Sequence, residues 1–393
     1  MLFSIALMLG IGMFMGWVCH RLHLPSLLGM ILTGILLGPY AFNVIDSSLL
    51  NISSELRRIA LIIILTRAGL SLDVEDLKKV GRPALLMCFV PACFEILGMV
   101  ILAPRLLGIS LIDAALMGAV VAAVSPAVVV PKMLKLMNEG YGVDKGIPQL
   151  ILAGASVDDV FVIVLFSAFT GLAQGNGVSP ISFISIPISI GVGIIVGLII
   201  GILLAWYFKR VHLRDSAKVV ILVCISFIMV TIEDNYSSVI PFAGLIAIMS
   251  MGIGLKEKRQ AVAQRLSLKF NKLWIAAEIL LFVLVGATVD IKYALLTGAS
   301  AIFLVLGAML FRMLGVFASL LKTNLSMKER LFCMIAYTPK ATVQAAIGGI
   351  PLAMGLASGN IILTVAVVAI LITAPLGAFL IELLYKKLLA HSL

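Results

Sequence analysis

The chain contains 393 residues, of which 62% are hydrophobic and 12% charged, and its formal net charge is +10. A soluble protein of this size needs far more charged side chains to cover its surface, which excludes soluble enzymes and soluble binding domains. The composition therefore predicts an all-α protein that crosses a lipid bilayer many times.

Thirteen apolar segments have close to the roughly 20 residues that a helix needs to cross the hydrocarbon core. We expect spans at 3–19, 25–42, 55–72, 82–103, 111–136, 147–172, 181–208, 217–233, 239–255, 272–290, 296–320, 331–357 and 359–386.

Lysine and arginine concentrate on one side of these predicted spans. Of the 29 such residues, 22 lie after odd-numbered spans or at the C-terminus, whereas Arg57, Arg58, Arg105 and Lys292 lie on the opposite side. Because positive loops face the cytoplasm, this bias predicts an outside N-terminus and a cytoplasmic C-terminus. The short loops favour a multi-pass protein of a prokaryotic plasma (inner) membrane. The basic run at 256–272 is interpreted as a cytoplasmic loop, with no nucleic-acid partner.

Four short matches relate the first half of the chain to the second at offsets of 213–217 residues. They pair Gly38 with Gly254, Asp73 with Asp290, Glu95 with Arg312, and Pro126 with Pro339. The second span then corresponds to the ninth, and a shift of seven spans reverses the direction of crossing. The halves are therefore predicted to be inverted repeats, an arrangement typical of secondary transporters that bind their substrate near the midplane.

Prolines interrupt the same span of each repeat. Pro126 and Pro131 lie in the fifth span, and Pro339 and Pro351 lie in the twelfth. Each proline removes a backbone donor and disfavours helix at the preceding residue. An ordinary kink would explain any one of them, but the symmetric Ser-Pro and Thr-Pro pair predicts two crossing broken helices that line a polar cavity.

Asp158 and Asp159 lie at the middle of the sixth span. Inserting an aspartate at this depth in the membrane costs about 2.5–3.5 kcal/mol. Neighbouring side chains on a helix point in different directions, yet both carboxylates can face one cavity. A proton and a small cation would compete there for the same oxygens, which couples their movements in opposite directions. The alternative is a pair that a buried basic residue merely neutralises.

Three more charges are predicted within the spans. Lys340 follows Pro339 at a break, where it can neutralise carboxylates near the midplane as a fixed or proton-exchanging counterion, or else snorkel to the surface. Glu95 and Arg312 occupy equivalent positions in the repeats and are predicted to form a buried, structural ion pair. If that pair is isolated, exchanging its two charges should recover the stability that either single change loses.

These motifs resemble the cation/proton antiporter superfamily, the sodium/proton exchangers, over essentially the whole chain. The matching elements are Ala155 to Asp159, Ser125-Pro126, Phe311 to Gly315, and Tyr337 to Ala346. The aspartate pair, together with the run Thr-Pro-Lys-Ala-Thr-Val-Gln, is most similar to the branch that keeps two adjacent aspartates.

The resemblance implies a homodimer whose protomers contain two domains. A transport core at 81–175 and 293–393 would move against a dimerisation domain at 1–80 and 211–292, with 176–210 as the connecting span. Asp159 would be the main ligand of the transported cation and Asp158 its partner. Candidate hydroxyl or carbonyl ligands are Ser125, Ser156 and Thr338.

The resemblance leaves the transported ion and the stoichiometry open. Na⁺ or Li⁺ exchange for protons is the first hypothesis, and K⁺ exchange on the same fold is the alternative. Electrogenic relatives with two aspartates often carry lysine where this chain has Arg312, so the resemblance is compatible with electroneutral as well as electrogenic exchange. No cofactor is expected beyond the transported ions.

Two other classes are less compatible with the sequence. An intramembrane aspartyl protease needs two membrane carboxylates, normally from different helices, and the adjacent positions of Asp158 and Asp159 argue against it. An ion channel would not need inverted broken helices, which favour alternating access over an open pore. The chain is therefore predicted to be a transporter and not an enzyme.

Overall fold

The computed structural model describes residues 1–22, 24–71, 81–173, 180–236 and 242–391. Within these ranges, the side chains of residues 156, 160, 180–187, 291 and 293–297 are outside the description. The chain divides into two compact units. Unit 1 contains residues 1–54, 74–174 and 281–393, and unit 2 contains residues 55–73 and 175–280.

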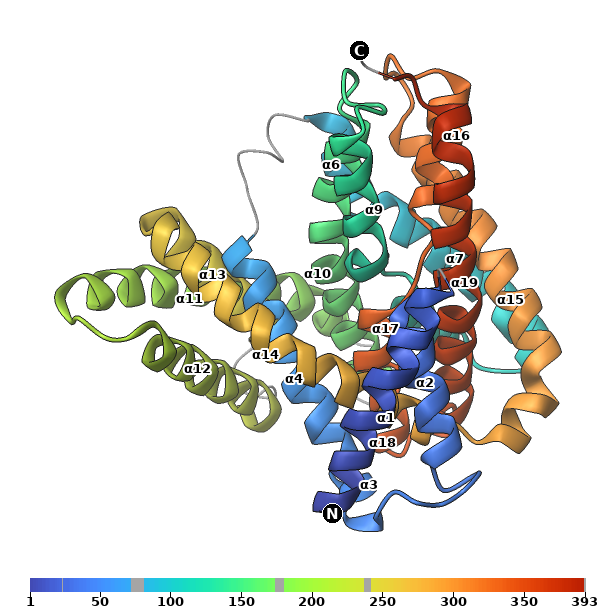
Figure 1. Cartoon of the computed structure of the whole chain (residues 1–393), viewed down its shortest axis with the longest axis horizontal. Coiled ribbons are helices and arrows are strands. Elements are labelled where there is room, and N and C mark those ends of the chain that lie inside the picture. Colours follow the sequence, from blue (N-terminus) through green and yellow to red (C-terminus); the bar gives the residue numbers. More distant parts are fainter. Residues whose placement is uncertain (23, 72–80, 174–179, 237–241, 392–393) are drawn as a thin grey trace. The chain divides into compact units, whose positions relative to one another are not determined.

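Unit 1 is built from helices of both halves of the chain (Figure 1). They are α1 (Leu2–Arg21), α2 (Ser26–Leu37), α3 (Ser47–Asn51), α6 (Arg82–Met87), α7 (Val90–Leu107), α8 (Leu111–Val121), α9 (Pro126–Asn138), α10 (Ile147–Ala173), α15 (Ile291–Ser319), α16 (Met327–Ala336), α17 (Thr342–Ile347), α18 (Ile350–Ala353) and α19 (Gly359–Leu388). The start of α1 and the end of α19 lie at opposite ends of this unit (Figure 1).

Unit 2 contains long helices that pack closely through glycines. They are α4 (Ser53–Ser71), α11 (Pro180–Arg210), α12 (Asp215–Tyr236), α13 (Gly244–Lys258) and the first part of α14 (Gln260–Ala287). A Cβ atom at Gly197 on α11 would lie 2.2 Å from the Ala247 carbonyl oxygen of α13, so only glycine permits this approach of the two helices.

The prediction of an all-α polytopic protein is confirmed. Each of the thirteen predicted spans overlaps a helix or an interrupted helix. Nine of the helical stretches in the described ranges are long and apolar enough to cross a membrane by themselves. The other four are α2, α4, α13 and the interrupted stretch from α16 to α18, which are short, broken or carry several charges. One predicted repeat match ends at Asp73, and Asp73 lies outside the described residues.

The expected loop at 256–272 is wrong, because this run is helical. Helix α13 continues to Lys258 and α14 begins at Gln260, so that only Arg259 lies between them. At 1.5 Å per residue, the 28 residues of α14 extend about 42 Å, which exceeds the roughly 30 Å of the hydrocarbon core. The basic residues thus mark where the chain leaves the hydrocarbon, and the helix continues past that point.

The two predicted helix breaks are present in unit 1. Helix α8 ends at Val121 and α9 begins at Pro126, while α16 ends at Ala336 and α17 begins at Thr342. The amide of Ser125 donates to the carbonyl of Pro339 at 2.7 Å, so the two breaks touch. Pro126 starts its helix, where a missing amide proton costs nothing. Pro131, in contrast, lies inside α9 without breaking it.

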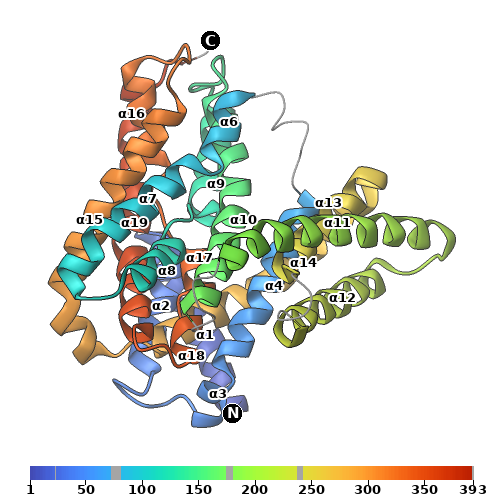
Figure 2. The ribbon, with the colours of Figure 1, turned by 180° about the vertical axis from the view of Figure 1, so that it is seen from behind.

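Helices α7 and α15 lie side by side (Figure 2). Equivalent glycines make the approach possible. A Cβ atom at Gly315 would lie 2.7 Å from the Cα atom of Pro91, and one at Gly98 would lie 2.7 Å from the ring of Phe311. Close packing of this kind places Glu95 of α7 within reach of Arg312 of α15.

Candidate functional site

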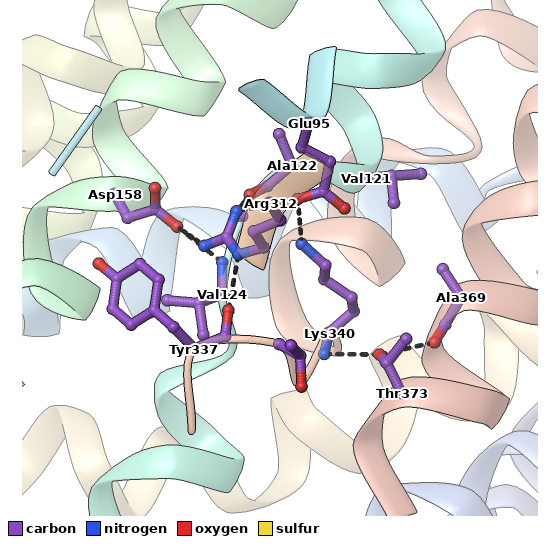
Figure 3. Close-up of polar contacts among 12 residues, drawn as sticks. Glu95, Val121, Ala122, Val124, Asp158, Arg312, Tyr337, Lys340, Ala369 and Thr373 are labelled. Atoms are coloured by element: carbon purple, nitrogen blue, oxygen red, sulfur yellow. Dashed lines mark hydrogen bonds and ion pairs between the residues drawn. The ribbon is translucent and has the colours of Figure 1, made fainter. Parts of the chain in front are cut away.

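Four charged side chains lie in the interior of unit 1 (Figure 3). They are Glu95 on α7, Asp158 on α10, Arg312 on α15, and Lys340 in the break between α16 and α17. Each is at most 1% exposed. Since an isolated charge in an apolar interior is very costly, such residues persist only when they are paired and hydrogen-bonded.

The four residues form one continuous chain of ion pairs. Arg312 donates through Nη2 to Asp158 Oδ2 at 2.8 Å and through Nη1 to Glu95 Oε2 at 2.9 Å. Lys340 Nζ donates to the same Glu95 oxygen at 2.5 Å (Figure 3). The order is therefore aspartate, arginine, glutamate, lysine, with two negative and two positive charges in balance.

Asp159, the next residue on α10, disturbs this balance. It is a half-buried third carboxylate next to a cluster that contains two cationic side chains, and its Oδ1 atom is buried without a hydrogen-bond partner. Burial opposes leaving this carboxylate both charged and unpaired. The cluster is therefore one positive charge short, a charge that either a proton or a monovalent cation can supply.

Charged side chains also satisfy the backbone of the two breaks. Asp158 Oδ2 accepts from the amide of Val124 at 2.7 Å. Arg312 donates through Nε to the carbonyl of Tyr337 at 2.6 Å and also contacts the carbonyl of Ala122. The amide of Lys340 donates to Thr373 Oγ1 on α19 at 2.9 Å. Broken helices at membrane depth require such partners, since lipid offers none.

Gln344 on α17 bridges the two breaks and is 1% exposed. Its Nε2 atom donates to the carbonyls of Val121 and Ala123 at 3.0 and 2.8 Å, and its Oε1 atom accepts from the amide of Ala341 at 2.8 Å. One amide side chain thus satisfies backbone groups from both breaks.

Replacing Gln344 with leucine should destabilise the protein by about 1–3 kcal/mol for each backbone group left unpaired. Thermal unfolding of the purified protein measures this loss. Gln149→Leu is the matched control, because Gln149 Oε1 is buried without a partner and its removal orphans no group. Equal melting temperatures of the two variants would contradict the bridging role of Gln344.

Several buried oxygens near this cluster have no hydrogen-bond partner among the described residues. They are Ser125 Oγ, Asp158 Oδ1, Asp159 Oδ1 and Thr342 Oγ1. Carboxylate and hydroxyl oxygens are the ligands that hard cations prefer. Three of these four, all but the Thr342 oxygen, belong to residues that the sequence singled out.

The other two predicted ligands, Thr338 and Ser156, are not among these unpartnered groups. Thr338 donates its hydroxyl proton to the carbonyl of Ile335 at 2.8 Å, so only its lone pairs remain for a ligand. The side chain of Ser156 lies outside the described residues. Thr342 was not singled out from the sequence, although it lies in the matched run that starts at Tyr337. Its hydroxyl lies in the first turn of the helix that follows a break, and this position could have marked Thr342 as a candidate ligand.

One predicted contact needs correction. Glu95 and Arg312 do contact each other, but the pair is not separate from the aspartates, since Arg312 also contacts Asp158. The reason is the planar guanidinium, whose five donors serve two carboxylates at once. Lys340 was expected to neutralise carboxylates near the midplane, and the carboxylate that it contacts is Glu95, at the same oxygen that Arg312 uses.

Inverted repeats whose broken helices cross beside buried carboxylates define a secondary active ion transporter. Comparison with known proteins identifies the kind of transporter. The family pattern described as "Sodium/hydrogen exchanger, transmembrane" matches residues 5–387, and the chain belongs to this family. It is accordingly a cation/proton antiporter and a multi-pass membrane protein.

Animal relatives and an archaeal structure are similar to almost the whole chain. Human sodium/hydrogen exchanger 9B2 is 34% identical over 385 residues, which cover 93% of this chain and 70% of the human protein. Mouse sodium/hydrogen exchanger 9B1 is 36% identical, with 94% and 67% covered. The sodium proton antiporter MjNhaP1 of Methanocaldococcus jannaschii superposes with a TM-score of 0.87 at 21% identity, covering 98% of this chain and 97% of the other.

Proposed function

We propose that the chain exchanges Na⁺ or Li⁺ for protons by alternating access, with Asp159 and Asp158 as the exchange site. The observation that carries this proposal is the missing positive charge: Glu95 and Asp158 balance Arg312 and Lys340, and the neighbouring Asp159 is a further carboxylate whose Oδ1 atom is buried without a hydrogen-bond partner. A proton on Asp159 or a cation beside it restores neutrality, but both together would exceed it. Competition for this one charge couples the two ions in opposite directions.

The two aspartates have different tasks in this mechanism. Asp158 is fixed by Arg312 and the amide of Val124 through Oδ2, and it offers its unpartnered Oδ1 to the cation. Asp159 has no such partners on Oδ1 and is the group that exchanges proton for cation. Ser125, Thr338 and Ser156, with Thr342 added, supply further oxygens.

Fixed counterions support electroneutral exchange of one cation for one proton. Arg312 does not release its proton under physiological conditions. Lys340 donates to Glu95 at 2.5 Å, and this ion pair supports a role as a structural counterion. Only Asp159 then changes its charge during the cycle.

The same proposal includes an assembly and an orientation. The protein forms a homodimer in which the core at 81–175 and 293–393 moves against the scaffold at 1–80 and 211–292, with 176–210 connecting them. The protein lies in a prokaryotic plasma membrane, with its N-terminus outside the cell and its C-terminus in the cytoplasm. The 22 basic residues on one side of the spans support this orientation.

Proteoliposomes with an internal pH dye test the function and the ion. We expect external Na⁺ and Li⁺ to dissipate an imposed acidic-inside gradient, in a response that a K⁺ ionophore does not change if exchange is electroneutral. A response to K⁺ alone would establish potassium/proton exchange instead. If no monovalent cation moves protons, the exchange proposal is wrong.

A further inference from the structure

A strongly basic pocket lies in unit 2, whereas the exchange-site residues belong to unit 1. It has a volume of about 480 Å³ and is formed where α11 ends, α12 begins and α13 passes into α14. Six of its ten lining residues carry basic side chains: Lys209, His212, Arg214, Lys218, Arg259 and Arg265. Asp215 is the only acidic residue among those that line it.

Most of this positive charge is not neutralised within the pocket. Asp215 already accepts from Lys218 at 3.1 Å and from Arg265 at 2.9 Å. Arg259 donates to the carbonyl of Phe208 at 3.1 Å, which orients the guanidinium without cancelling its charge. Lys209 and Arg214 are exposed. The pocket therefore keeps an excess of positive charge in a concave site, which concentrates the potential for an anion.

Its position in the helices places the pocket at a membrane surface. Two candidate spans, which end at Arg210 and begin at Asp215, meet there. Trp206 is 55% exposed and Tyr207 is 40% exposed, one turn before the end of α11. Exposed aromatic residues at the end of a span are typical of the headgroup layer, where phosphate groups of lipids lie. A basic pocket between helices at this depth matches the charge of such a group.

We propose that this pocket binds a negatively charged phosphate group, carried either by an anionic phospholipid headgroup or by a free phosphate. Arg214 and Lys209 contribute the charge that remains available, and the pairs of Asp215 with Lys218 and Arg265 hold the walls in place. The guanidinium of Arg259 offers its remaining donors to the phosphate oxygens, the geometry in which arginine binds phosphate best. Binding at this site stabilises unit 2.

Thermal unfolding of the full chain in detergent tests the proposal with four additives. These are dioleoyl phosphatidylglycerol, dioleoyl phosphatidylcholine, glycerol phosphate and inorganic phosphate. A ligand that binds the folded state raises the melting temperature, and the shift grows with the logarithm of the ratio of ligand concentration to Kd. A shift with phosphatidylglycerol alone identifies the lipid as the source, whereas an equal shift with the soluble phosphates identifies the free anion. No shift with any anionic additive would overturn the proposal.

The double variant Lys209→Gln, Arg214→Gln assigns the shift to this pocket. Each basic residue near the membrane surface contributes about 1 kcal/mol to the binding of an anionic group. We therefore expect the apparent affinity of the double variant for the phosphate ligand to be roughly 30-fold lower than that of the wild type. Arg210→Gln is the matched control, since Arg210 belongs to the same helix turn but lies over the Trp206 ring at 4.5 Å and does not line the pocket. If the double variant keeps the full shift, or the control loses it equally, the pocket is not the binding site.

Discussion

Replacing Asp159 with asparagine is expected to abolish cation-dependent proton movement in proteoliposomes while making the folded protein more stable. The variant has two carboxylates and two cations in the cluster, so the unpaired buried charge is gone. Removing an uncompensated buried charge should stabilise the fold by about 1–3 kcal/mol. Stabilisation of the purified protein by Na⁺, which reports binding without transport, should disappear as well.

Asp158→Asn separates the tasks of the two aspartates. It removes the carboxylate that Arg312 and the amide of Val124 share, so we expect a lower melting temperature instead of a higher one. Asp144→Asn is the control for a change of charge, because Asp144 is exposed in the loop before α10. Exchange that persists in the Asp159 variant, or equal effects of both substitutions on stability, would refute the assigned roles.

The sequence was sufficient to predict the spans, the inverted repeats and the two breaks. Lipid imposes a strict rule that every backbone group is satisfied within the protein, so apolar length and paired prolines carry most of the information. The contact between Glu95 and Arg312 followed from their equivalent places in the repeats. The helical run at 256–272 was missed, because basic residues report the membrane surface and not the end of a helix.

The connections within the site could not be derived in this way. Two cationic and three acidic residues allow several pairings, and only the positions of α7, α10, α15 and the break before α17 select one of them. The bridge made by Gln344 depends on the same crossing. A sequence shows which buried groups need partners. Which partner each group finds depends on how the helices are placed in space, and the repeat pattern does not determine that placement.

Exchanging the charges of Glu95 and Arg312 is expected not to restore stability, although an isolated ion pair would tolerate the exchange. In the double variant Glu95→Arg, Arg312→Glu, the new arginine would face Lys340 and the new glutamate would face Asp158. The carbonyls of Ala122 and Tyr337 would also lose their donor. Breaking a buried pair costs about 3–5 kcal/mol, and here the exchange adds two repulsive contacts to that cost.

Thermal unfolding of Glu95→Gln, Arg312→Gln and the charge-exchanged double variant distinguishes a network from a pair. We expect Arg312→Gln to be the less stable of the two single variants, since it leaves both Glu95 and Asp158 without the guanidinium, whereas Glu95→Gln leaves Arg312 bound to Asp158. Arg105→Gln, an exposed change in the last turn of α7, should unfold like the wild type. Recovery of wild-type stability in the double variant would show that Glu95 and Arg312 act independently of the aspartates. Failure to recover means that Asp158 of the exchange site and Glu95 at the contact between α7 and α15 depend on the same arginine.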